Sequence, residues 1–173
     1  FAGAHNIDNA LAAAAFALAL GIPLATIAQG LNQAPVTKGR LNFIKHTLPK
    51  GTLTLIDDTY NANPESMRAA IDVLANQNYE KILIIGDMGE LGKKAVQYHA
   101  SIATHINKKK TLHVVGIGKL TKHTIDKCNG NAKWFNNKKE LIQYVKSKIR
   151  KNSCVLVKGS RFMKMEEVVE ALT

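Results

Sequence analysis

Two carboxylates and two amides lie within seven residues near the middle of this chain. Asp57 and Asp58 end an apolar run, and Asn61 and Asn63 follow them in a polar loop. A carboxylate accepts hydrogen bonds from hydroxyl groups, and an amide both donates and accepts. Turns are polar even where nothing binds, so the same residues could form a plain strand-to-helix connection. Their density favours a ligand-binding loop.

The segments on either side of this loop predict a strand and a helix. The apolar run Leu53–Ile56 is typical of a buried strand, whereas Asn63 can cap a helix and Pro64 suits its first position. Apolar residues then recur at helical spacing, at Met67, Ala70, Ile71 and Leu74. Strand, loop and helix in this order place the loop at the carboxyl edge of an α/β sheet, where ligands bind.

The same alternation continues along the chain and predicts an α/β fold. Strands are expected at 42–46, 52–56, 81–85, 111–115, 134–135 and 154–157, mostly separated by helices. Such repeats predict a Rossmann-like, mostly parallel sheet with helices on both faces and right-handed crossovers. Residues 42–173 would form this domain, and residues 1–41, with helices near 5–20 and 24–31, would precede it as a short helical tail. The carboxyl edge would carry Asp58, Gly86, Gly116 and Lys158.

One glycine loop gives an alternative function. Gly116 and Gly118 nearly match the fingerprint of a nicotinamide dinucleotide site, but Thr121 stands where the third glycine is expected. Asn136 or Asn137 stands where that fingerprint needs an acid. An oxidoreductase domain is therefore the runner-up. No P-loop pattern occurs in the sequence.

Two further segments carry polar side chains next to predicted strands. In the loop Gly86–Gly92, Asp87 could act with His99 of the following helix, or the two could form a structural hydrogen-bonded pair. Lys158, Ser160 and Arg161 surround Gly159 at the start of the last predicted helix, which is a natural seat for an anion. A purely structural turn is the alternative there.

The segment Asp57–Met67 resembles the signature of the Mur ligases, and four other segments agree with it in order. These are His5-Asn6-x-x-Asn9, Gly39-Arg40, the loop Gly86–Gly92 with His99, and Lys158-Gly159-Ser160-Arg161. Within the family the chain is most similar to the member that joins D-alanyl-D-alanine to UDP-N-acetylmuramoyl-tripeptide in peptidoglycan synthesis. The resemblance covers nearly all of the chain.

The resemblance implies roles for individual residues. Those assigned to the nucleotide are Asn6 and Asn9 for adenine, Arg40 for ribose or phosphate, and Asp58 for the ribose hydroxyls. Those assigned to the substrate are Tyr60, Asn61 and Asn63 in a cleft between domains, and Lys158, Ser160 and Arg161 for the incoming carboxylate. No catalytic residue and no metal ligand are assigned.

The implied activity is that of an ATP-dependent ligase acting through an acyl phosphate. The cofactors would be ATP and Mg²⁺, with their principal ligands in sequence upstream of Phe1. Residues 1–41 would be the tail of the central ATP-binding domain, and residues 42–173 the family's C-terminal domain. The first residue, Phe1, suggests a fragment, which alone should be inactive.

The charge distribution gives a third alternative. The net charge is +11, and the window Lys108–Lys151 holds thirteen Lys or Arg against Asp126 and Glu140. Such asymmetry can mark a nucleic-acid-binding module. The lysines have few aromatic residues between them, however, so a solvated surface is favoured and no nucleic-acid partner is expected.

The remaining features fit a monomeric cytoplasmic enzyme. Cys128 and Cys154 are the only cysteines and are expected to be reduced thiols in or near the core. The longest apolar stretch, Ala10–Leu20, is too short to cross a bilayer, so no membrane insertion is expected. No basic segment precedes it, as a signal peptide would require.

Overall fold

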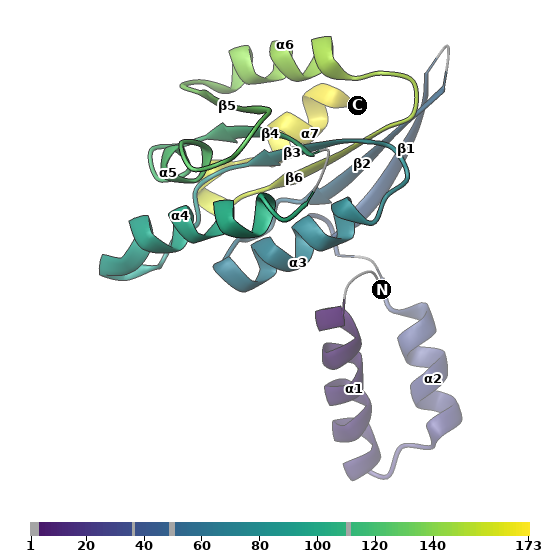
Figure 1. Cartoon of the computed structure of the whole chain (residues 1–173). Coiled ribbons are helices and arrows are strands. Elements are labelled where there is room, and N and C mark those ends of the chain that lie inside the picture. The colour runs from purple at the N-terminus through teal and green to yellow at the C-terminus, as the bar shows by residue number, and fades with distance from the viewer. Residues whose placement is uncertain (1–3, 36, 49–50, 110–111) are drawn as a thin grey trace. The chain divides into compact units, whose positions relative to one another are not determined.

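The computed structural model describes residues 4–35, 37–48, 51–109 and 112–173, with side chains from Ile7 onward. These residues form two compact units, Phe1–Thr37 and Lys38–Thr173. In the first unit, α1 (Ala4–Ala19) and α2 (Leu24–Gln33) lie side by side (Figure 1). Gly21, with φ of +77°, ends the first helix in the left-handed conformation that glycine adopts at low cost.

This helix pair buries little of its own apolar surface. Ile27 is buried, whereas Phe16 and Leu24 are about two-thirds exposed. Amphipathic helices owe most of their stability to packing of the apolar face. Two helices with this much exposed apolar surface therefore do not form a core by themselves.

The second unit is built on a six-stranded sheet with the order β1-β2-β6-β3-β4-β5. The strands are β1 (Asn42–Leu48), β2 (Gly51–Asp58), β3 (Glu80–Ile85), β4 (Leu112–Ile117), β5 (Ala132–Phe135) and β6 (Ser153–Lys158). β1 and β2 form an antiparallel hairpin, and all other neighbours are parallel. The predicted mostly parallel sheet is confirmed.

The burial of each strand follows from its neighbours. β6 is buried along its whole length, because it lies between β2 and β3 and has helices on both faces. β1, at the edge, alternates between exposed and partly buried residues. A continuous apolar run and an alternating run therefore mark central and edge strands, respectively.

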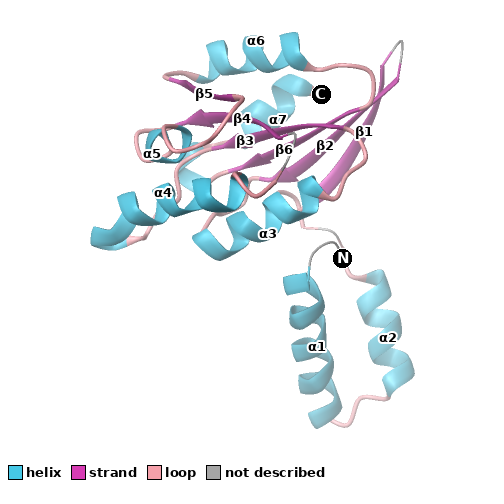
Figure 2. Ribbon diagram, in the orientation of Figure 1, coloured by secondary structure: helices cyan, strands magenta, loops and turns pink. Residues whose placement is uncertain are grey.

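Helices cover both faces of the sheet (Figure 2). One layer holds α3 (Pro64–Ala75), α4 (Ala95–Ile106) and the short α5 (Lys122–Ile125), and the other holds α6 (Lys138–Lys148) and α7 (Glu166–Leu172). α3 buries the four residues that its spacing predicted, Met67, Ala70, Ile71 and Leu74. On the opposite face, α6 and α7 pack Leu141, Val145, Val168 and Leu172 against the strands.

The end of the chain differs from the prediction. The segment after Lys158 does not lead directly into a helix; a 3-10 turn, Arg161–Met163, comes first and α7 begins only at Glu166. Lys164 has φ of +48°, a left-handed conformation that a right-handed helix cannot contain. Ser160 and Arg161 therefore lie beside a turn rather than at a helix N-terminus.

Candidate functional site

The candidate site lies at the carboxyl edge of the sheet, where β2, β6 and β3 end side by side. β2 leads into α3 on one face, β6 leads toward α7 on the other, and β3 leads toward α4 on the first face again. Open α/β sheets bind ligands at such a reversal in the direction of the connections. Asp58, Lys158 and Gly86 occupy the ends of these three strands, as predicted.

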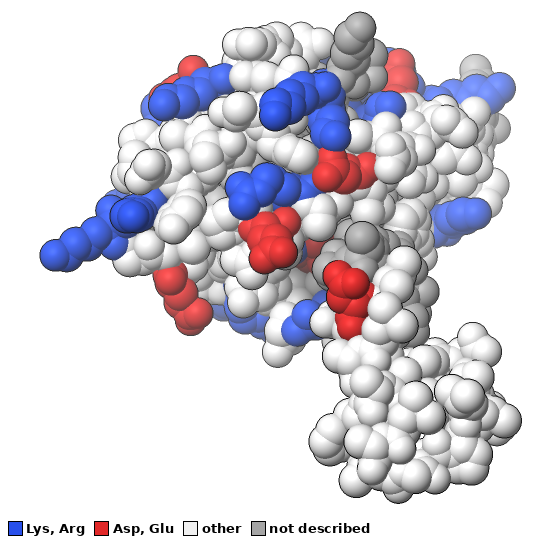
Figure 3. Space-filling view, turned by 60° about the horizontal axis from the view of Figure 1, so that its bottom comes forward, with Lys and Arg blue, Asp and Glu red and all other residues white. Residues whose placement is uncertain are grey.

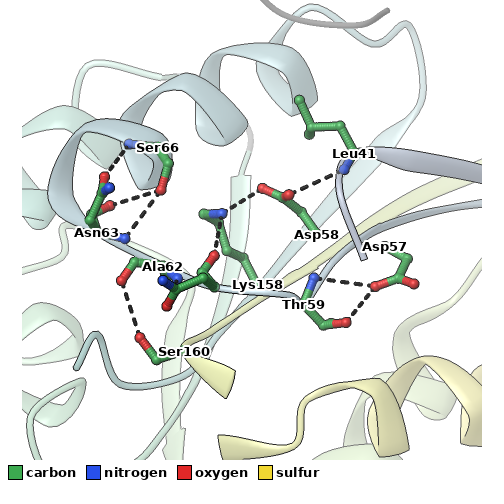
Figure 4. Close-up of polar contacts among 10 residues, drawn as sticks. Leu41, Asp57, Asp58, Thr59, Ala62, Asn63, Ser66, Lys158 and Ser160 are labelled. Carbon is green, nitrogen blue, oxygen red and sulfur yellow. Dashed lines mark hydrogen bonds and ion pairs between the residues drawn. The ribbon is translucent and has the colours of Figure 1, made fainter. Parts of the chain in front are cut away.

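A buried ion pair forms the centre of this edge (Figure 4). The ammonium group of Lys158 donates to Asp58 Oδ2 at 2.6 Å, and only 2% of its side chain is exposed. Asp58 Oδ1 accepts from the backbone N–H of Leu41 at 3.1 Å. Burial lowers the pKa of Lys158, and the negative charge of Asp58 acts in the opposite direction. Both oxygens of Asp58 are thus held from within the protein.

The loop that follows β2 is fastened to the end of β6 and to the loop after β3. Lys158 donates a second hydrogen bond to the carbonyl oxygen of Asn61 at 2.9 Å. The hydroxyl of Ser160 donates to the carbonyl of Ala62 at 3.1 Å and accepts from the N–H of Gly89 at 2.7 Å. Two side chains from β6 and its following loop therefore fix the backbone of the loop 59–63.

Asp57 takes no part in the ion pair, although it is the immediate neighbour of Asp58. Its carboxylate accepts from the N–H and hydroxyl of Thr59, at 3.2 and 2.6 Å. The two aspartates have separate partners, as expected for successive residues of a strand, whose side chains point to opposite faces. Figure 4 shows the two carboxylates directed apart.

Arg40 lies against the same loop. Its guanidinium group stands 4.5 Å from the centre of the Tyr60 ring, and the N–H of Tyr60 donates to the carbonyl of Gly39 at 2.9 Å. Gly39 has φ of +77°, and a Cβ there would meet the Tyr60 backbone, so only glycine fits. The predicted Gly-Arg pair thus places a cation over the Tyr60 ring, one residue before Leu41, whose N–H binds Asp58.

A pocket of about 530 Å³ opens beside the ion pair. It is lined by Tyr60, Asn61, Gly89, Glu90, Ser160, Arg161 and Phe162. The predicted residues Tyr60, Asn61, Ser160 and Arg161 line it, whereas Lys158 does not. The pocket combines one anionic, one cationic and two aromatic side chains, which suits a small zwitterion.

Glu90 is the lining residue that sequence reasoning missed. Its φ of +59° is uncommon for a residue other than glycine, and such conformations gather at ligand sites. Its position in the loop Gly86–Gly92 could have placed it near the site. Its residue type could not have predicted the left-handed backbone conformation. Phe162, 63% exposed, also lines the pocket, and no role was predicted for it.

Asn63 has a structural role at the start of α3. Its side-chain oxygen accepts from the N–H of Ser66 at 2.8 Å, and its own N–H donates to the Ser66 hydroxyl at 3.1 Å. This reciprocal pair is a capping box. The predicted helix start is confirmed, and a substrate contact by Asn63 stays a prediction.

Asp87 and His99 do not form the hydrogen-bonded pair that was one interpretation of their spacing. His99 accepts from the N–H of Met88 at 2.9 Å and donates to the carbonyl of Ala95 at 2.8 Å. Asp87 accepts from the N–H and hydroxyl of Thr121, at 2.7 and 2.8 Å. Both ring nitrogens of His99 are thus engaged elsewhere.

The contact of Asp87 also bears on the nicotinamide alternative. Its carboxylate packs directly against Gly118 and accepts the N–H of Thr121, just before α5. A dinucleotide fold would place a pyrophosphate at this helix start. Here a carboxylate of the protein already occupies the position, and a second anion would be repelled.

The two asparagines expected at adenine belong to the other unit. Asn9 is exposed on α1, and the side chain of Asn6 lies outside the described residues. Both therefore remain predictions. Within the described part of the chain, no group of three or more potential ligands could hold a metal ion.

A larger cavity, of about 990 Å³, opens at the opposite, amino edge of the sheet. Two of its lysines already have partners: Lys81 donates to carbonyls at the end of α3, and Lys109 pairs with Asp72. These contacts stabilise the fold. The carboxyl edge is therefore the better candidate site.

The remaining surface and thiol features are unremarkable for catalysis. On the face shown in Figure 3, Lys and Arg are interspersed with Asp and Glu rather than gathered in one patch. Cys128 and Cys154 are free, and burial raises the pKa of each thiol to about 11, which leaves them protonated and weakly reactive.

None of the described helices has the length and apolar character needed to span a bilayer.

Comparison with known proteins finds a matching family model and relatives that align with nearly the whole chain. Residues 39–161 match the family model described as "Mur ligase, glutamate ligase domain". The chain is 44% identical over 99% of its length to UDP-N-acetylmuramoyl-tripeptide–D-alanyl-D-alanine ligase of Buchnera aphidicola from Acyrthosiphon pisum. The enzyme of that name from Escherichia coli is 40% identical over 98% of the chain.

Solved structures match the chain over the same nearly complete length as the sequence relatives do. The crystal structure of MurF from Acinetobacter baumannii has a TM-score of 0.87 and 40% identity, and the match covers 99% of this chain and 38% of that one. The chain spans 37% of the Buchnera and Escherichia relatives. The similarity therefore concerns a little over a third of such a protein.

Proposed function

Because this chain belongs to the Mur ligase family, we propose that it is the carboxyl-terminal part of an ATP-dependent ligase that adds D-alanyl-D-alanine to UDP-N-acetylmuramoyl-tripeptide. The observation that carries the proposal is the match of nearly the whole chain to relatives of that name, at 36–44% identity in five bacteria. The pocket beside Asp58 supports it.

The proposed reaction activates a carboxylate and then captures it with an amine. ATP would phosphorylate the terminal carboxylate of the tripeptide. The amine of D-alanyl-D-alanine would attack the acyl carbon, form the new C–N bond, and release inorganic phosphate as the C–O bond breaks. Cationic groups and Mg²⁺ would stabilise the charge that develops on the phosphate.

The nucleotide side of the site would use Asp58 and Arg40. A carboxylate has about four acceptor positions, and Asp58 uses two of them on Lys158 and the Leu41 N–H. The two that remain suit the adjacent hydroxyls of a ribose. Arg40 would contact ribose or phosphate, and Asn6 and Asn9 would bind adenine. We assign no Mg²⁺ ligand to the described residues.

The dipeptide would occupy the pocket beside the ion pair. Arg161 would bind its carboxylate, Glu90 would bind its ammonium group, and Tyr60 and Phe162 would contact the two methyl groups. Ser160, whose one hydroxyl proton goes to Ala62, would shape the pocket wall. The pocket volume of about 530 Å³ is ample for two alanine residues. Ion pairs at both ends of the dipeptide would fix its orientation in the pocket.

The test is product formation by the full-length protein. We expect UDP-N-acetylmuramoyl-tripeptide, ATP, Mg²⁺ and D-alanyl-D-alanine to give one pentapeptide product, one ADP and one phosphate, measured by mass spectrometry and phosphate release. L-alanyl-L-alanine is the control and should give little product. Addition of a single amino acid in place of the dipeptide would assign the protein to a different reaction of the family.

A further inference from the structure

Lys158 is buried in a way that few lysines are. Its side chain is 2% exposed, and lysine is among the residues that are almost never fully buried without a partner. It ends the central strand β6, directly opposite Asp58 of β2 in the parallel register. The two charged groups therefore lie next to one another because of the strand order, at the sheet edge that carries the candidate site.

The hydrogen bonds of Lys158 point inward, to the protein itself. Its ammonium group donates to Asp58 Oδ2 at 2.6 Å and to the carbonyl of Asn61 at 2.9 Å. It does not line the adjacent pocket, whereas Ser160 and Arg161 do. Two of its three N–H groups are thus used within the protein, and with 2% of the side chain exposed the ammonium group offers a ligand little access.

Asp58, in contrast, has acceptor positions left over. Its other oxygen is held by the N–H of Leu41, the residue after Arg40, so the carboxylate is fixed at both ends. About 12% of its side chain remains exposed. A fixed carboxylate binds a diol more tightly than a mobile one, because less rotational freedom is lost on binding.

We infer that Lys158 is a positioning residue for the nucleotide: it holds the Asp58 carboxylate and the Asn61 backbone in place and makes no contact with the dipeptide. This inference rests on the proposed function, because it takes Asp58 as the ribose-binding group. It separates the Lys-Gly-Ser-Arg segment into two parts. Lys158 serves the nucleotide side, and Ser160 and Arg161 serve the dipeptide side.

A merely structural ion pair would behave differently. Buried ion pairs often add little net stability, and removal of one partner destabilises the fold through the charge left behind. A structural role would therefore lower stability and leave the substrate affinities of the folded protein unchanged. A positioning role changes nucleotide affinity in protein that is still folded.

The test is a double-mutant cycle in the full-length protein, with Lys158→Met, Asp58→Asn and the combination of both. ADP affinity is measured by calorimetry and the KM values for ATP and the dipeptide by steady-state kinetics. Lys158→Met should weaken ADP binding and raise the KM for ATP by at least about tenfold, the loss of one charge-assisted hydrogen bond. The KM for the dipeptide should stay within about twofold. Lys139→Met, at an exposed lysine of α6, is the matched control and should change neither.

The double variant keeps the inference testable if Lys158→Met does not fold. It removes both buried charges, and it should match Asp58→Asn in ADP affinity and in the KM for ATP, because Lys158 acts on the nucleotide through Asp58. The KM for the dipeptide should also match, because Ser160 still holds the carbonyl of Ala62, next to Asn61, when the bond from Lys158 is lost. A higher dipeptide KM in the double variant than in Asp58→Asn would show that Lys158 serves the dipeptide side and overturn the inference. An unchanged ADP affinity in folded Lys158→Met would also overturn the inference. Failure of the unmodified protein to make product would instead refute the proposed function, and calorimetry would still report on Lys158.

Discussion

At the scale of single residues, His99 shows how a neutral ring can hold a loop in place. Nδ1 must carry the proton, because it faces the carbonyl of Ala95, and Nε2 must be free to accept from the N–H of Met88. The ring is 1% exposed, and burial lowers its pKa, although the charge of Asp87 acts in the opposite direction. Met88 precedes Gly89 and Glu90 at the pocket, so the neutral ring supports the loop that lines it.

A pH dependence of stability follows. The folded pKa of His99 lies below its ordinary value of 6.5, so the unfolded chain binds a proton first as the pH falls. The contribution of the neutral His99 ring to the free energy of unfolding is fully present above about pH 6.5. It decreases as the pH falls below that value, by up to about 1.4 kcal/mol per pH unit, until the pH reaches the lowered pKa of His99 in the folded protein. Urea unfolding of this chain at several pH values between about 7.5 and 5 measures it.

His99→Gln should be less stable at neutral pH. Its free energy of unfolding should also lose the part of the pH dependence that His99 contributes. The control is His123→Gln, at an exposed histidine of α5. Its charge has the smallest of the effects on the pKa of His99, so this variant should keep most of the pH dependence of the unmodified chain. An unchanged slope in His99→Gln would show that its protonation is not linked to unfolding. Burial also lowers the pKa of His113, which contributes a slope of the same sign in every variant.

At the scale of elements, the loop 59–63 is held by the structures on both sides of it. Asp57 binds Thr59 at its start, Lys158 and Ser160 bind its middle, and the capping box of α3 fixes its end. The loop therefore has little freedom despite its polar composition. This rigidity is what a binding loop needs if its contacts are to survive the entropy cost of ligand binding.

Removal of the cap tests the contribution of the helix start. Asn63→Ala should lower the free energy of unfolding by about 1 kcal/mol, because the N–H of Ser66 loses its acceptor. Asn137→Ala removes the equivalent cap of α6, which accepts from the N–H of Glu140, and should cost a similar amount. Thermal or urea unfolding of both variants gives the comparison.

The same pair separates capping from substrate binding in the full-length protein. Only Asn63→Ala should change the KM for the dipeptide if Asn63 also contacts the substrate. Equal stability losses with no change in KM in either variant would restrict Asn63 to its capping role.

The sequence predicted the elements well because their signals are local. The cap of α3, its apolar face and the glycine that ends α1 are each decided within a few residues. The ion pair was not predicted, because Asp58 and Lys158 are 100 residues apart and meet only when β6 inserts between β2 and β3. The left-handed conformations of Glu90 and Lys164 were missed as well, since neither residue is a glycine.

At the scale of the molecule, the chain contains two units of different character. Lys38–Thr173 has a full sheet with helices on both faces, whereas Phe1–Thr37 is a helix pair with exposed apolar residues. The relatives of this chain are nearly three times as long as the chain itself. The exposed apolar residues of the helix pair could pack against further chain, and its place in an ATP-binding domain stays a prediction.

This chain by itself should not hydrolyse ATP. Its sequence has no P-loop, and the few nucleotide contacts proposed for it cannot offset the entropy of ordering a triphosphate. We expect a dissociation constant of about 1 mM or weaker, which corresponds to about −4 kcal/mol. Calorimetry with ATP and a phosphate-release assay measure both properties. Turnover of ATP by the purified 173-residue chain would contradict the prediction.

The central claim is that the carboxyl edge binds the nucleotide at Asp58 and the dipeptide at Arg161. The most direct measurement is the KM for each substrate in full-length Asp58→Asn and Arg161→Ala, with Asp57→Asn as the matched control and folding checked by circular dichroism. Asp58→Asn should raise the KM for ATP by roughly tenfold to a few hundredfold, and Arg161→Ala should do so for the dipeptide by about tenfold or more. Asp57→Asn should change both much less. A larger effect of Asp57→Asn, with near-normal ATP dependence in Asp58→Asn, would contradict the account.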